Sequence, residues 1–202
     1  MIKVYGTSHV SEESFDVIDE AFKEVDPDVV ALELCPVRLE AMLREGETDS
    51  QGPMFMKILQ KFQAYIGKKT GVMPGMEMLY AYEKAVDEEK DVILVDQDIR
   101  ITVQNLMGTR RKERVKAVLA LAAAFVLPGD SFDIAKIPED RQITFMLQRF
   151  RERFPGIFDA IVEDRNRYMV EALTNYREEH PDQDIAVFVG AAHKGELKCD
   201  LE

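Results

Sequence analysis

The sequence predicts an α/β fold with a mostly parallel sheet flanked by helices, together with a helical insertion or cap. Short strand-like apolar runs alternate with stretches of helical periodicity, which is the pattern of an α/β protein. The run at residues 29–34 is apolar except for Glu33, as is typical of strands that are covered on both faces. A long helical stretch separates the third expected strand from the fourth, and this stretch predicts the insertion.

The expected elements of the first third follow a strand–helix–strand order. Residues 2–5 form the first strand, and Ser11 can cap the helix that follows. That helix has one apolar face, made by Phe15, Ile18, Phe22 and Val25. After the second strand at 29–34, Pro36 begins a helix that Gly46 ends.

The rest of the chain repeats this alternation with longer helices. A turn-rich break at 71–75 separates two expected helices, and a Pro-Gly pair at 128–129 interrupts the long helical middle. In order, we expect helices at 55–66 and 76–89, a strand at 92–95, helical structure over most of 102–154, a helix at 157–176 and a strand at 185–189.

Length, charge and cysteine content limit the class of protein. We expect a single domain over residues 1–200, with the helical insertion at about 99–155, and residues 201–202 could be a cloning scar on a piece of a longer protein. The net charge of −12 argues against a nucleic-acid partner. Two cysteines and no expected signal peptide favour a reducing, cytoplasmic location. The longest apolar stretch, 118–127, is about half as long as a spanning helix needs to be.

Two similar turns carry the first candidate site residues. Residues 6–9 and 190–193 both read G-x-x-H at the end of an expected strand, and they hold two of the three histidines, His9 and His193. If the two strands are adjacent and parallel, both imidazoles lie at one sheet edge, as a metal site or an acid–base pair requires. Gly6 and Gly190 could adopt positive φ there, or could simply be small enough for helix packing.

Acidic side chains stand at the other strand ends. Glu33 lies in an apolar strand, so its carboxylate needs a metal, a cation or a proton. An ion pair with Arg38 and ligation of a metal explain Glu33 equally well. Asp96 could be a ligand or a helix cap, with the cap favoured. Cys35 is expected to be a buried free thiol rather than a ligand.

An arginine falls on an otherwise apolar helix face. Arg165 shares its expected face with Ile161, Tyr168, Met169 and Ala172. An inward arginine should meet a carboxylate, with Glu33, Asp96 or a substrate as candidates, unless its head extends to solvent. Met54, Phe55 and Met56 could be core or interface residues, and a homo-oligomer is possible. The sequence has no H-E-x-x-H, G-x-S-x-G, Walker or dinucleotide motif.

Taken in order, these motifs resemble the TraB family (TraB/PrgY/GumN), which is related to the Tiki proteins. The resemblance covers most of the chain. Gln97 stands where the family has arginine, and Ala192 stands where it usually has glycine. The segments that carry the resemblance are 6–9, 30–35 with Arg38, 71–77, 95–99 with Thr102, 163–169 and 189–193.

The resemblance implies an α/β fold with a metal site. Tiki proteins are regarded as divalent-metal proteases that use two G-x-x-H histidines and a glutamate, which correspond here to His9, His193 and Glu33. TraB proteins are linked to shutdown of a peptide pheromone, and many microbial members carry membrane helices after the second G-x-x-H. The full-length protein could therefore be anchored in the cell membrane with this domain in the cytoplasm.

We therefore expect a divalent-metal-dependent hydrolase of a peptide or small amide-containing ligand, using Mn²⁺, Co²⁺ or Zn²⁺. His9, Glu33 and His193 would hold the ion. Alternatively, Glu33 would be the general base, and Asp96 or Glu163 would ligate the ion. Arg165 or Arg38 would orient the site or stabilise an oxyanion. The alternative is a non-catalytic regulatory domain of a membrane protein that binds or sequesters a peptide, as in pheromone shutdown. Glu163 is a further candidate for catalysis, and Gly6, Asp96, Asn166 and Gly190 are other candidate site residues.

Overall fold

The computed structural model describes residues 1–7, 13–44, 75–126 and 140–202. Its centre is a parallel sheet in the order β1-β4-β2-β3. The strands are β1 (Ile2–Thr7), β2 (Val29–Leu32), β3 (Asp91–Leu94) and β4 (Ile185–Gly190). The expected α/β fold with a mostly parallel sheet is confirmed.

The strand order makes neighbours of the two ends of the chain. β1 pairs in parallel with β4, so that Gly6 lies opposite Val189 and Thr7 lies opposite Gly190. β4 pairs on its other side with β2, which in turn pairs with β3. The central strands β2 and β4 are buried throughout. All four strands therefore present their carboxyl ends at the same edge of the sheet.

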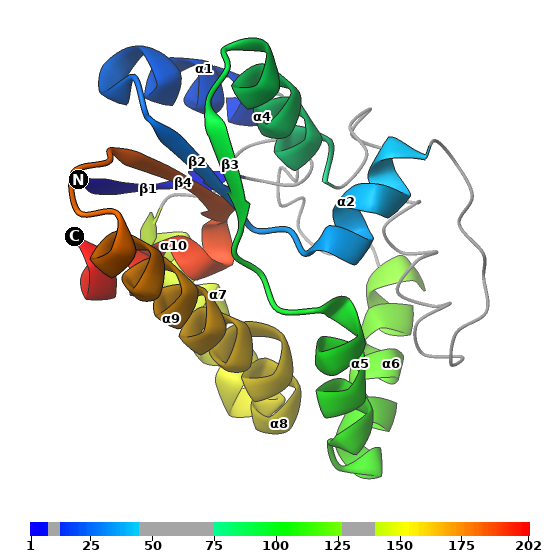
Figure 1. The fold of residues 1–202 in the computed structure, drawn as a ribbon. Coiled ribbons are helices and arrows are strands. Elements are labelled where there is room, and N and C mark those ends of the chain that lie inside the picture. Colours follow the sequence, from blue (N-terminus) through cyan, green and yellow to red (C-terminus); the bar gives the residue numbers. More distant parts are fainter. Residues whose placement is uncertain (8–12, 45–74, 127–139) are drawn as a thin grey trace.

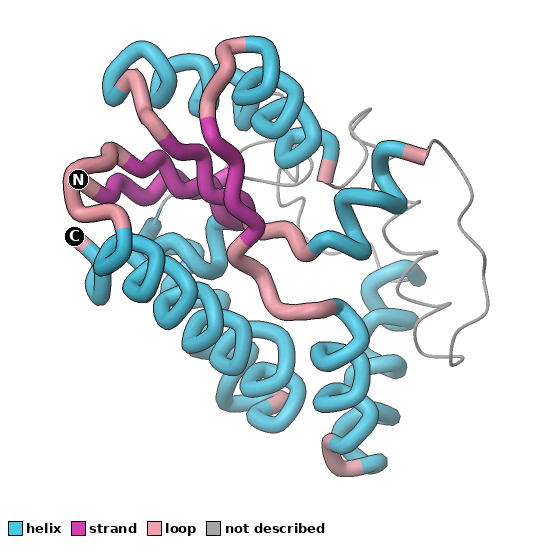
Figure 2. The backbone as a smooth tube through the Cα atoms, in the orientation of Figure 1, coloured by secondary structure: helices cyan, strands magenta, loops and turns pink. Residues whose placement is uncertain are grey.

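Helices cover both faces of the sheet, as Figures 1 and 2 show. α1 and α4 pack on one face, where Phe22 and Met78 meet Leu32 and Phe188. α9 and α10 pack on the other face. The helices of the described residues are α1 (Glu13–Val25), α2 (Pro36–Leu43), α4 (Met76–Asp87), α5 (Ile99–Gly108), α6 (Arg111–Val126), α7 (Asp140–Arg153), α8 (Pro155–Phe158), α9 (Asp164–Glu179) and α10 (Ala191–Leu201).

Local sequence explains where several of these elements begin. Pro36 occupies the first turn of α2, where its missing N–H is not needed. Asp98 caps α5 by accepting a 2.8 Å hydrogen bond from the backbone N–H of Arg100. Gly75 precedes α4 with φ of 97°, a conformation that favours glycine.

The long stretch between β3 and β4 is helical, as expected. α5 and α6 extend away from the sheet beyond the end of β3 (Figure 1), and α5 to α8 share a small core of Leu106, Phe154 and Ile157. A π-helical turn, η1 (Asp159–Glu163), joins α8 to α9. Of the helices in the described ranges, none is both long and apolar enough to cross a membrane.

The last residues of the chain belong to the packed structure. Leu201, the last residue of α10, is buried in the core. Glu202 accepts a 2.7 Å hydrogen bond from the backbone N–H of Val4 on the edge strand β1. Residues 201 and 202 therefore contribute to covering the sheet edge.

Candidate functional site

The carboxyl edge of the sheet gathers the polar residues that follow the strands. Glu33 directly follows β2, and its backbone N–H still donates to Phe188 O on β4 (3.0 Å). Its Oε2 accepts a 2.5 Å hydrogen bond from the N–H of Gly190, the last residue of β4. Asp96 follows β3, and its N–H donates to Leu34 O (3.2 Å). Glu33 and Asp96 are both buried, so each carboxylate needs a partner within the protein.

Arg165 is that partner for both carboxylates. It lies in the first turn of α9, and its Nη2 pairs with Glu33 Oε1. Its Nε is 2.9 Å from Asp96 Oδ1, and its Nη2 is 2.9 Å from Asp96 Oδ2, which makes a bidentate pair. The prediction that Arg165 points inward to a carboxylate is confirmed, and it meets both of the proposed protein partners.

The electrostatics of Arg165 follow from this placement. Burial of the guanidinium by itself lowers the pKa of Arg165, but the charge of Glu33 and the hydrogen bonds to Asp96 outweigh burial and raise it. Arg165 therefore stays protonated at every pH at which the protein is folded. One fixed positive charge stands between two buried carboxylates.

His193 completes the cluster from the other side. β4 passes into α10 without an intervening loop, so His193 lies in the first turn of α10 and is buried. Its Nε2 is 3.5 Å from Glu33 Oε1 and 3.1 Å from Arg165 Nη1. Its Nδ1 is 2.5 Å from Oδ1 of Asn166, the buried residue that follows Arg165.

Several predicted residues lie elsewhere than expected. Arg38 contacts Asp96 (3.5 Å), while Glu33 is paired with Arg165. The helix cap expected at Asp96 is made by Asp98, because Asp96 lies inward against Arg165.

Glu163 is half-buried and forms an ion pair with Arg151 of α7. It is therefore held by the helical insertion, in the last position of η1.

The two glycines do not use the left-handed region. Gly190 has φ of −59°, and in the described part of the chain Gly75 is the only glycine with positive φ. Gly6 is instead needed for packing, because a Cβ there would stand 2.7 Å from Cδ and 3.2 Å from Cβ of Lys194 on α10. Of the two alternatives, positive φ applies at neither position, and the packing alternative applies to Gly6.

The buried face of α9 is rotated by one residue from the expected one. It runs through Asn166, Met169 and Leu173, whereas Tyr168 is exposed. The π-helical turn η1 holds one residue more than an α-helical turn. The core-facing positions before and after η1 therefore do not follow one continuous 3.6-residue period. Such turns are frequent at functional sites, and this one lies directly before Arg165.

Two other expectations concern cysteines and residues outside the described ranges. Cys35 is buried and free, as predicted, and Cys199 is exposed. His9 and residues 54–56 lie outside the described residues.

The structure brings Glu33, Asp96, Asn166, Arg165 and His193 together, with Arg38 at the margin of the cluster.

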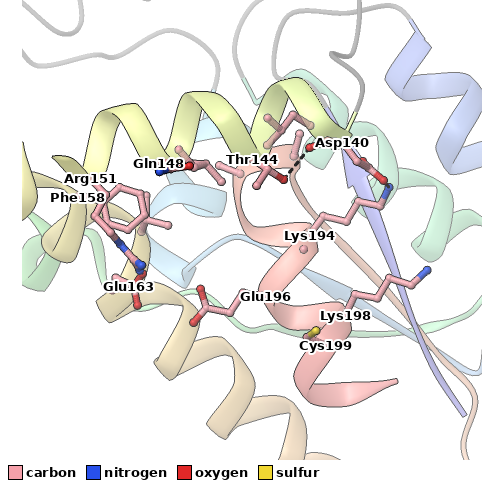
Figure 3. Close-up of a pocket in the computed structure, with 16 residues that line it drawn as sticks. Asp140, Thr144, Gln148, Arg151, Phe158, Glu163, Lys194, Glu196, Lys198 and Cys199 are labelled. Carbon is pink, nitrogen blue, oxygen red and sulfur yellow. Dashed lines mark hydrogen bonds and ion pairs between the residues drawn. The ribbon is translucent and has the colours of Figure 1, made fainter. Parts of the chain in front are cut away.

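A cavity of about 580 Å³ lies beside this cluster, between α7, η1 and α10 (Figure 3). Its walls are largely apolar, and they include Ile143, Leu147, Phe158 and Val162. Ala191 and Ala192 line it as well, directly after the glycine that binds Glu33. A volume of this size suits a small ligand or the side chains of a peptide.

Ion pairs and Glu196 supply the polar groups of the cavity. Lys194 pairs with Asp140 (3.1 Å) at one end, and Arg151 pairs with Glu163 at the other (Figure 3). Glu196 lines the cavity and accepts a 2.6 Å hydrogen bond from Asn166 Nδ2. The sequence points to Glu196, three residues after His193, but holds no signal for its pairing with Asn166.

The donor set can be tested against a divalent ion. Within the ranges that the structure describes, no three His, Cys, Asp or Glu residues are grouped so that they could hold a metal. His193 Nε2 and Glu33 Oε1 do form a pair of donors, 3.5 Å apart. Two ligands at metal distances of about 2.1 Å in tetrahedral geometry are about 3.4 Å apart. This separation matches two ligands of one ion, but both atoms already face the guanidinium of Arg165, which pairs with Glu33 Oε1 and lies 3.1 Å from His193 Nε2.

Comparison with known proteins places this chain in a family. An uncharacterised protein of Methanocaldococcus jannaschii is 29% identical over 95% of this chain. TraB domain-containing proteins of Homo sapiens and Bos taurus are each 25% identical over 85% of it. The chain spans about half of the length of these relatives, 51% in each case. The sequence profile of the TraB/PrgY/gumN family matches residues 2–196, and the chain belongs to that family.

Proposed function

We propose that this domain is a divalent-metal-dependent hydrolase that acts on a peptide or another amide. The observation that carries the proposal is the 3.5 Å separation between His193 Nε2 and Glu33 Oε1 at the carboxyl edge of a parallel sheet. Ligands of open parallel sheets bind at this edge. An imidazole and a carboxylate are common ligands of a catalytic metal that keeps an open position.

His193 and Glu33 would hold the ion together with His9. The pairing of β1 with β4 sets Thr7 opposite Gly190, so the two G-x-x-H segments leave the sheet from adjacent strands. A bound Mn²⁺, Co²⁺ or Zn²⁺ lowers the pKa of coordinated water and polarises a carbonyl group.

The chain's own groups would orient this site. The N–H of Gly190 holds Glu33 Oε2, which leaves Oε1 on the side of His193. Arg165 is fixed on Asp96 by two hydrogen bonds, so it would remain in place as a positive charge beside the reacting carbonyl. Because Arg165 Nη1 lies 3.1 Å from His193 Nε2, Arg165 and an ion would compete for that lone pair.

Arg38 and Glu163 would act at the margin of the site. Arg38 is only partly buried against Asp96, so its guanidinium can reach an oxyanion of a bound substrate. Glu163 lines the cavity and could carry a proton there. The cavity would receive the apolar side chains of the substrate, because most of its wall is apolar.

The proposal is tested by incubating the protein with a mixed peptide library and Mn²⁺, Co²⁺ or Zn²⁺, followed by mass spectrometry. We expect new termini that EDTA abolishes and that the Glu33→Gln variant fails to produce. Glu179→Gln on α9 is the matched control, because Glu179 is exposed and distant in sequence from every site residue. Cleavage that persists in EDTA and in Glu33→Gln would contradict the proposal.

One observation favours a second function, a non-catalytic domain that binds or sequesters a peptide. Arg165 already pairs with both buried carboxylates, as a purely structural ion network would require. In that case the cavity alone binds the peptide. Peptide affinity would then survive EDTA, and no product would form.

A further inference from the structure

A row of hydrogen bonds connects the wall of the cavity to His193. Glu196 lies on the exposed side of α10 and lines the cavity (Figure 3). Its Oε2 is 2.6 Å from Asn166 Nδ2, and Asn166 Oδ1 is 2.5 Å from His193 Nδ1. Asn166 and His193 are both buried, so water has little access to the bond between them, whereas Glu196 is exposed.

The donors and acceptors in this row can have only one order. An ionised carboxylate only accepts hydrogen bonds, so Asn166 must turn its NH₂ group toward Glu196. The amide oxygen of Asn166 is then left for His193 Nδ1, which must carry the proton.

The opposite side of the ring leads independently to the same result. Arginine has no acceptor, so Arg165 Nη1, at 3.1 Å, can only donate to His193 Nε2. Nε2 must therefore present its lone pair. Both neighbours of the imidazole require the tautomer with hydrogen on Nδ1.

We propose that Glu196 is a positioning residue that acts through Asn166 to hold His193 in the Nδ1–H tautomer, with the Nε2 lone pair directed toward Arg165 Nη1. The inference rests on the proposed function only for its consequence, that Nε2 is the nitrogen for which a metal would compete with Arg165. A ligating histidine commonly donates its other N–H to an oxygen acceptor, and loss of such a partner costs about 10- to 100-fold in metal affinity.

Three variants separate this role from simple packing. Glu196→Gln keeps an acceptor for Asn166, so it should preserve the tautomer. Glu196→Leu removes the acceptor and frees the Asn166 amide to turn its NH₂ group toward the ring. Asp200→Leu makes the same chemical change at an exposed position of the same helix and serves as the control.

The first measurement is long-range ¹H–¹⁵N NMR of metal-free protein at about pH 8, above the ordinary pKa of an imidazole. The chain has three histidines, so His9→Gln and His180→Gln assign the signals. We expect wild type, Glu196→Gln and Asp200→Leu to show protonated Nδ1 and unprotonated Nε2 at His193. In Glu196→Leu the Nε2–H form should rise, but only in part, because Arg165 Nη1 still donates to Nε2 in that variant. A wild-type ring protonated on Nε2 would overturn the proposal without any variant.

The second measurement is the affinity for Zn²⁺, Mn²⁺ and Co²⁺ by titration calorimetry. Glu196→Leu should lose about 10- to 100-fold, and Glu196→Gln much less. If the tautomer is as expected but no ion binds, the positioning role stands and the proposed function fails. If an ion binds and Glu196→Leu changes neither tautomer nor affinity, the positioning role is wrong and the proposed function survives.

Discussion

Replacing Arg165 by methionine tests the ion network at the sheet edge. Arg165→Met keeps an unbranched apolar stem but removes the charge between Glu33 and Asp96, which have side chains only 2% and 4% exposed. Breaking a buried pair by removing one partner costs about 3–5 kcal/mol. Glu33 would keep the Gly190 N–H and Asp96 would keep Arg38 at 3.5 Å, so neither carboxylate loses every partner. We expect the free energy of unfolding to fall by an amount within this range at pH 7.

The pH dependence of this loss has a definite sign. In the variant, the buried carboxyl groups without Arg165 bind protons more readily in the folded chain than in the unfolded chain. The stability of the variant relative to wild type should therefore rise as the pH falls from 7 toward 5. In wild type the positive charge remains, because the charge of Glu33 and the hydrogen bonds to Asp96 raise the pKa of Arg165.

The assay is urea unfolding followed by circular dichroism, in EDTA, at pH 7 and pH 5. Arg167→Met is the matched control, because Arg167 lies on the same helix, is 73% exposed and pairs only at the surface with Asp164. Its cost should stay below about 1 kcal/mol. A loss under about 1 kcal/mol for Arg165→Met, with no change between the two pH values, would refute the reasoning.

Three further predictions concern packing and acid sensitivity. Leu197→Ala should cost about 2–5 kcal/mol in urea unfolding, because Leu197 is fully buried between α10 and the sheet; a Tm equal to that of wild type would contradict this. Gly6→Ala should destabilise the protein by about 1–3 kcal/mol through its clash with Lys194, and Lys194→Ala in the same chain should recover part of the loss in a double-mutant cycle. Hydrogen bonds from the side chain and backbone of Arg100 lower the pKa of Asp98 to about 2. The contribution of Asp98 to stability is therefore complete above the ordinary carboxyl pKa and is lost as the pH falls toward 2. An NMR titration of Asp98 with a midpoint near 4 would contradict this.

Much of the fold could be predicted because its signals are local. The apolar run at 29–34 and the strand at 185–189 are the two central strands, and their burial on both faces explains why they lack alternation. Capping by Asp98 rather than Asp96 could not be predicted, because either residue suits a cap. The choice depends on Arg165, which is 69 residues away in sequence.

The candidate site was predictable in its members but not in its contacts. Glu33 and Arg165 stand out because each is a charge in an apolar pattern. The link between His193, Asn166 and Glu196 has no such signal, since it depends on how α9 packs against α10. The π-helical turn η1 adds one residue before α9 and so changes which positions of α9 face the core. No regular period in the sequence indicates this change, and Tyr168 was therefore wrongly expected to face inward.

The measurement that tests the central claim most directly is metal content by plasma mass spectrometry, on protein purified without chelator or nickel resin. Wild type is compared with Glu33→Gln, with a variant that carries His9→Ala and His193→Ala, and with His180→Ala, which removes an exposed histidine as the control. The account predicts near-stoichiometric Mn, Co or Zn in wild type and His180→Ala, with most of it lost in the other two. Wild-type protein that holds no metal, and that gains no thermal stability on addition of Mn²⁺, Co²⁺ or Zn²⁺, would contradict it.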